Sequence, residues 1–189
     1  MRHSKFNSIF LLASIVIIAS ACSSTSAIED AEPNLPDWYL SPPADNSEYL
    51  YTIGEAESQR RGTASDQARV SAQGAMAAKL ETMVEGMQKL FEEEITSGEE
   101  SNYREAWTNV TRTITQQELR GGSVAQRDFV VNHDTGRYEA FILYQLPVGD
   151  ARSQLENSLS MEEELYTRFR ESEAFEEMNQ RLEQLSGDN

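Results

Sequence analysis

The sequence predicts an α+β fold, in which a small antiparallel sheet is combined with one long helix and a helical C-terminal tail. Apolar residues recur at steps of three and four from Ala68 to Ile95, as in a helix with one buried face. Two apolar runs flank a turn-rich stretch between residues 123 and 147, which is typical of a β-hairpin. Removing residues 1–21 from the 189 leaves 168 residues, enough for one domain with a substantial core.

Residues 1–21 have the features of a signal peptide. Arg2 and Lys5 precede an apolar run that is too short for a comfortable membrane span and ends in small residues. Ala19-Ser20-Ala21-Cys22 then resembles a bacterial lipobox, and Cys22 is the only cysteine in the chain. We therefore predict that Cys22 is the lipidation site. The alternative is a secreted protein cut after Ala21, with a free thiol.

Lipidation would determine where the protein resides. The two or three acyl chains of a bacterial lipoprotein hold it on a membrane, and no second apolar run of about 18 residues follows Cys22. Ser23 is not the Asp that retains many lipoproteins at the inner membrane. The expected location is the outer membrane, at its periplasmic face rather than the cell surface, with membrane lipid as the partner of acylated Cys22.

The charge of the chain narrows the choice of partners. Residues 1–21 hold two of the 16 basic and none of the 32 acidic side chains, so the remainder carries 14 − 32 = −18 formal charges. This balance argues against nucleic acid, which needs a basic surface. It indicates either a basic partner or simply solubility at high density on a membrane.

The predicted elements follow in order after a polar tether at 22–35. A first strand spans 49–54, and the polar residues at 62–66 are suited to begin the long helix. A second helix is expected over 102–119, with Tyr103, Trp107, Val110 and Ile114 on one side. The α+β domain is predicted to cover 36–147, and the acidic helical tail 148–189.

Two apolar surfaces are expected to be available for contacts. In the second hairpin strand Tyr138, Ala140, Ile142 and Tyr144 share one face, while Phe141 and Leu143 lie on the other. The tail carries a further stripe: Leu155, Leu159, Leu165, Phe169, Phe175, Met178, Leu182 and Leu185. We expect the second face of the hairpin and this stripe to be contact surfaces.

Several residues in a fixed order resemble the LPP-twenty lipoprotein family, which is related to the flagellar assembly lipoprotein P. They are Pro36-Asp37-Trp38, Ile53-Gly54-Glu55-Ala56, the Ala-rich helix around Ala68-Arg69, Ala72 and Ala75, and Gly121-Gly122. The resemblance covers residues 36–147. It implies a strand–helix–strand–strand module, in which the sheet curls around the helix as in the ring-forming dodecins. The family has no established enzymatic residues, so the resemblance assigns none to this sequence.

Trp38 and Tyr39 are expected to pack onto this module, where the tether becomes structure. The alternative is an exposed aromatic platform for sugar, peptidoglycan or lipid headgroups.

The sequence offers no catalytic, cofactor-binding or metal-binding residues. His133 is the single histidine after the signal peptide and lies at the predicted hairpin tip, without the partners of a catalytic triad. Clusters of His and Cys are missing. We therefore expect a non-enzymatic envelope scaffold that self-associates. The alternatives are a tethered binding module for a flagellar or cell-wall protein, and an envelope hydrolase.

Overall fold

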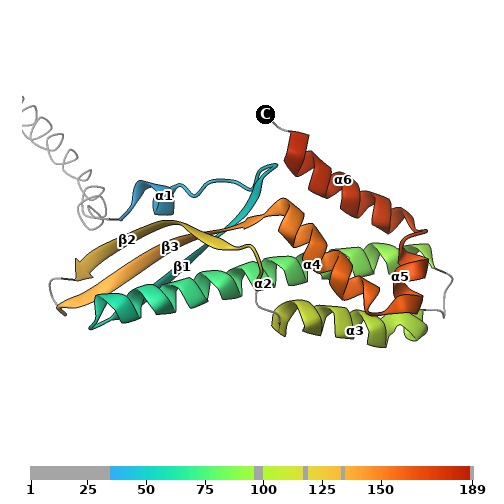
Figure 1. Ribbon diagram of the computed structural model, residues 1–189, viewed down its shortest axis with the longest axis horizontal. Coiled ribbons are helices and arrows are strands. Elements are labelled where there is room, and N and C mark those ends of the chain that lie inside the picture. The colour runs from blue at the N-terminus through green and yellow to red at the C-terminus, as the bar shows by residue number, and fades with distance from the viewer. Residues whose placement is uncertain (1–34, 96–99, 117–118, 133–134, 188–189) are drawn as a thin grey trace, which may run out of the picture. The chain divides into compact units, whose positions relative to one another are not determined.

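The computed structural model describes residues 35–95, 100–116, 119–132 and 135–187. The predicted signal peptide, the tether up to residue 34, Cys22 and His133 lie outside the described residues. The chain divides into two compact units, and the second spans Pro36–Asn189 (Figure 1). Its elements are α1 (Asp37–Leu40), β1 (Tyr49–Ser58), α2 (Arg61–Glu94), α3 (Glu100–Gln116), β2 (Ser123–Asn132), β3 (Arg137–Pro147), α4 (Val148–Ser160), α5 (Glu163–Phe169) and α6 (Glu173–Gly187).

The three strands form one antiparallel sheet in the order β1-β3-β2. The first strand is longer than predicted, and Tyr49 lies opposite Pro147 while Ser58 lies opposite Tyr138. The hairpin strands β2 and β3 have the predicted bounds, with a register shift between Val124 and Gln126. The α+β fold class is confirmed.

The N-terminal half of α2 packs against one face of the sheet (Figure 1). Gly54 makes this close approach possible, because a Cβ there would lie 2.2 Å from the Ala68 carbonyl oxygen and 2.2 Å from the Ala72 nitrogen. The helix begins earlier than predicted, since its N-cap is Arg60 and no side chain caps it. Seven residues of the predicted stripe are buried, and so is Ala64, which precedes it; the seven are Ala68, Ala72, Met76, Leu80, Val84, Met87 and Phe91.

The segment around α1 covers the other face of the sheet. The Tyr39 ring lies edge-on to Phe141 with centroids 4.6 Å apart, and the Trp38 indole donates to Asp128 at 2.8 Å. The packing predicted for Trp38 and Tyr39 is confirmed. Phe141 and Leu143 are each only 1% exposed, so the prediction that this face of the hairpin is a contact surface was wrong. The chain covers that face itself.

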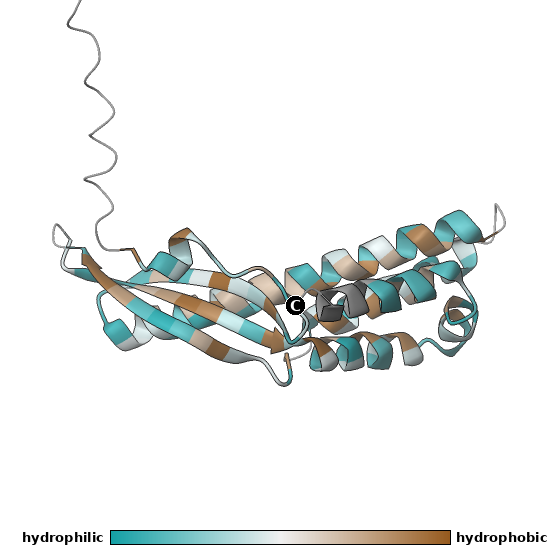
Figure 2. Ribbon diagram, turned by 90° about the horizontal axis from the view of Figure 1, so that it is seen from above, coloured by the Kyte–Doolittle hydropathy of each residue, from teal (hydrophilic) through white to brown (hydrophobic). Residues whose placement is uncertain are grey.

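The C-terminal half of α2 is enclosed by helices instead of by the sheet (Figure 1). Figure 2 shows hydrophilic and hydrophobic residues on these helices, as expected when one side of each is buried. The aromatic rings of Phe91, Trp107 and Phe169 contact one another, and Phe175 contacts Phe169, with centroids 5.5 to 6.0 Å apart.

The tail belongs to this same core. Leu155, Leu159, Leu165, Phe169 and Met178 are buried in one cluster with residues of α2 and β3. The side chains of Leu182 and Leu185 lie outside the described residues. The expectation that the tail stripe is free for contacts was therefore wrong for the described part of the stripe.

Candidate functional site

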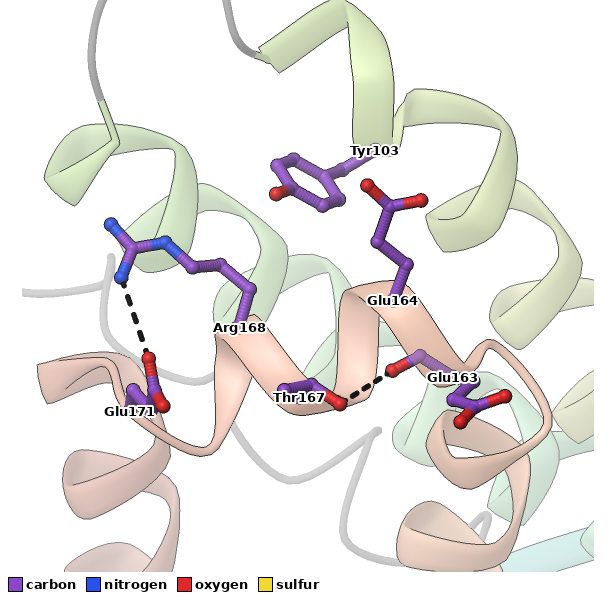
Figure 3. A pocket seen from close by; sticks show the side chains of 6 residues that line it. All are labelled: Tyr103, Glu163, Glu164, Thr167, Arg168 and Glu171. Atoms are coloured by element: carbon purple, nitrogen blue, oxygen red, sulfur yellow. Dashed lines mark hydrogen bonds and ion pairs between the residues drawn. The ribbon is translucent and has the colours of Figure 1, made fainter.

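A hollow between α3 and α5 is the first candidate site (Figure 3). It encloses about 560 Å³ and is lined by Tyr103, Glu163, Glu164, Thr167, Arg168 and Glu171. The Thr167 hydroxyl donates to the Glu163 carbonyl at 2.9 Å, and Arg168 lies 3.9 Å from Glu171. These two contacts link neighbouring residues of α5 and of the turn that follows it. Covalent catalysis requires a nucleophile that lies beside a base, and the lining residues of this hollow form no such pair.

Glu139 on β3 is an acidic residue whose pKa is shifted by its surroundings. The pKa of Glu139 is raised above its ordinary value of 4.5, first by burial of the carboxyl and then by repulsion from Glu55 and Glu57. Glu57 lies directly opposite on β1 and forms an ion pair with Arg137 at 3.1 Å. Glu139 lines none of the hollows described here, so it gives no support to a hydrolase.

A second hollow, the arginine groove, lies where the sheet meets the helical end of the unit. It encloses about 640 Å³, and its lining residues are Arg69, Val70, Gln73, Gly74, Ala77, Thr115, Leu119, Arg120, Gly122 and Tyr144. The residues at 69, 73 and 77 share one side of α2, since they are four residues apart. The remaining wall comes from the end of α3, the link to β2, and Tyr144 of β3.

The outer edge of β1 is closed by side chains. The Tyr51 N–H donates to Asp45 Oδ1 at 2.8 Å, and the Tyr51 carbonyl accepts from Lys79 Nζ at 2.9 Å. The ion pair between Lys79 and Asp45, at 2.8 Å, joins these two groups. The Tyr49 carbonyl accepts from the Asn46 N–H at 3.0 Å. This part of the edge therefore has few free backbone groups to pair with another strand.

The outer edge of β2 is different. The N–H and carbonyl of Tyr51 point away from β3. The N–H and carbonyl of Gln145, which lies opposite Tyr51, therefore point toward β2. The backbone groups of Leu143 and Phe141, two and four residues earlier in β3, point the same way. Asp128, opposite Phe141, is thus bonded to β3, while its neighbour Arg127 directs its N–H and carbonyl outward. Within the described part of the chain, β2 pairs with no strand other than β3.

The single functional residue that the sequence predicts is the lipidation site, Cys22. Cys22 and His133 lie outside the described residues, so their surroundings are not described. Among the residues that are described, no group of three or more His, Cys, Asp or Glu is arranged to hold a metal ion. Sequence reasoning missed the arginine groove. The spacing of Arg69 and Gln73 on α2 was a visible signal, but Arg120 and Tyr144 come from distant parts of the chain.

The family described as LPP20 lipoprotein matches residues 36–143, more than half of the 189 residues. No curated protein and no solved structure matches the chain. None of the helices in the described ranges is long and apolar enough to cross a membrane.

Proposed function

Because the chain belongs to the LPP20 lipoprotein family, we propose that it is a non-enzymatic outer-membrane lipoprotein that acts as an envelope scaffold through self-association. The acyl chains on Cys22 hold it at the periplasmic face of the membrane. The folded unit from Pro36 onward then makes the contacts between copies.

The open outer edge of β2 is the observation that carries this proposal. An exposed strand edge presents unpaired N–H and C=O groups that a second strand can bond. The two edges of this sheet differ. Asp45, Asn46 and Lys79 form hydrogen bonds with backbone groups at the outer edge of β1, whereas no described residue forms such bonds with the outward backbone groups in the middle of β2. Two copies that meet antiparallel at β2 form a closed, two-fold contact.

A proline at Arg127 tests this contact. Proline removes the outward N–H of that residue and leaves the bonds from β2 to β3 in place, because proline is tolerated where the N–H of an edge strand faces solvent. We expect Arg127→Pro to weaken self-association of the full-length lipidated protein by about tenfold or more, since a two-fold contact loses the bond twice. Sedimentation equilibrium in detergent measures this.

Arg127→Ala is the matched control, because it removes the same charge and keeps the N–H. It should associate like the unaltered protein. If the unaltered protein stays monomeric at high concentration, the scaffold proposal is refuted. If the two substitutions have equal effects, the contact between copies does not involve the outer edge of β2.

The arginine groove favours a second candidate function. A groove of this size could receive part of a flagellar or cell-wall protein, in which case the lipoprotein recruits or regulates that protein as a tethered binding module. Cross-linking in the native envelope separates the two. Recovery of the protein with copies of itself supports the scaffold, whereas a monomer recovered with one specific partner supports the binding module.

A further inference from the structure

The arginine groove has a charge unlike that of the chain around it. The sequence holds 32 acidic and 16 basic side chains, yet Arg69 and Arg120 line the groove and none of the described lining residues is acidic. Arg120 has no carboxylate within ion-pair distance among the described residues. Arg69 lies 3.8 Å from Asp66, but both side chains are largely exposed, and such pairs are weak in water.

The hydroxyl of Tyr144 adds a buried donor to the groove. Tyr144 is only 2% exposed, and its oxygen accepts a long hydrogen bond of 3.5 Å from Gln73. The hydroxyl proton has no acceptor among the described residues, and a buried donor without a partner is costly. The groove therefore combines two cationic groups with a donor that lacks an acceptor.

Gly122 leaves room for this hydroxyl in the wall of the groove. A Cβ at position 122 would lie 2.1 Å from the Tyr144 hydroxyl oxygen, where it would occupy the space next to the donor. The wall also has an apolar part, formed by Val70, Ala77 and Leu119. Val70 is 63% exposed although it is hydrophobic. Pockets of about 300–1,000 Å³ hold small organic molecules, and this groove is of that size.

We propose that the arginine groove binds a small organic anion. Its carboxylate or phosphate accepts hydrogen bonds from the two arginines and from the Tyr144 hydroxyl, while its apolar part lies along Val70 and Leu119. Planar guanidinium groups suit both kinds of oxyanion, because they donate two parallel hydrogen bonds. This site does not depend on pairing of β2, so it stands whether or not the protein self-associates.

Titrations of the full-length lipidated protein in detergent, at low salt, test the site. Benzoate and phenyl phosphate are the two organic probes, benzamide is the uncharged match for benzoate, and inorganic phosphate lacks an apolar part. We expect benzoate or phenyl phosphate to shift the backbone amide NMR signals of Gly74 and Gly122 in a saturable way. Benzamide should bind at least about tenfold more weakly than benzoate, since it lacks the charge.

Three variants assign the binding to the groove. Arg69→Gln, Arg120→Gln and Tyr144→Phe each remove one polar group, and each should weaken the better probe by about tenfold. Tyr144→Phe keeps the buried ring, so its melting temperature shows whether the fold is intact. Arg104→Gln is the matched control, because this exposed arginine of α3 does not line the groove.

The outcomes separate clearly. Tighter binding of benzoate assigns the carboxylate, and tighter binding of phenyl phosphate assigns the phosphate. Absence of saturable shifts with both organic probes overturns the proposal, as does benzamide binding as well as benzoate. Inorganic phosphate binding as tightly as phenyl phosphate overturns the organic character of the ligand. An equal loss in Arg104→Gln would mean that general charge, rather than the groove, attracts the probe.

Discussion

Glu139 shows how one side chain makes the stability of the fold depend on pH. The pKa of this carboxyl is raised in the folded protein by burial and then by Glu55 and Glu57, so the folded state disfavours the charged form. A raised pKa gives a contribution to the free energy of unfolding that is complete below the unfolded value of 4.5. That contribution is lost as the pH rises through the raised pKa.

Glu139→Gln should therefore be more stable than the unaltered protein at about pH 7, by about 0.5 kcal/mol or less, because it removes a partly buried charge that faces Glu57 and because solvent screens this repulsion. The difference should shrink toward zero at about pH 4, where the glutamate is protonated in both states. Urea unfolding at the two pH values measures it. Glu176→Gln, at an exposed acid of α6, controls for the lost charge, and a benefit that is the same at both pH values would contradict the assignment.

At the residue scale, the sequence indicated some contacts and concealed others. The family resemblance included Gly54 and the Ala-rich half of α2, and in the structure Gly54 lies against Ala68 and Ala72. The role of Gly122 was not predictable in this way. It depends on the hydroxyl of Tyr144, which lies in another strand, and only the pairing of β2 with β3 brings the two together.

At the scale of elements, α5 shows that the tail stabilises the rest of the unit. Phe169 is fully buried between the rings of Phe91 of α2 and Trp107 of α3. Phe169→Ala should reduce the free energy of unfolding by about 3–5 kcal/mol, because it leaves a cavity in a packed aromatic cluster. Urea unfolding followed by circular dichroism measures the loss.

Met161→Ala is the control for that experiment. Met161 is 70% exposed in the same tail, and its loss should change the free energy of unfolding by about 0.5 kcal/mol or less. If Phe169→Ala had an equally small effect, the tail would be an appendage rather than part of the core.

The elements themselves followed from periodicity, but their partners did not. The steps of three and four in α2 and the two runs of the hairpin predicted their positions well. An apolar stripe on a helix does not specify what covers it, so the tail stripe was expected to meet another protein. Phe141 and Leu143 were misjudged for a similar reason, because the four-residue α1 is too short to show a period.

At the scale of the whole molecule, the proposed membrane attachment depends on one residue, Cys22. We expect the unaltered protein to incorporate labelled palmitate, and Cys22→Ala to lose the label, because the only thiol of the chain is at that position. Ser23→Ala is the neighbouring control and should keep the label. Labelling that survives in Cys22→Ala would show that the acyl chains are attached elsewhere.

Lys79 has a practical consequence for anyone who labels this protein chemically. The chain has three lysines, Lys5, Lys79 and Lys89, and the amine of Lys79 is held by Asp45 and the Tyr51 carbonyl. Amine-reactive reagents should modify the exposed Lys89 faster than Lys79, because the Lys79 amine is engaged by Asp45 and by the Tyr51 carbonyl. The ratio of the two modification rates therefore reports how often the contacts of Lys79 with Asp45 and Tyr51 open at this edge of the sheet.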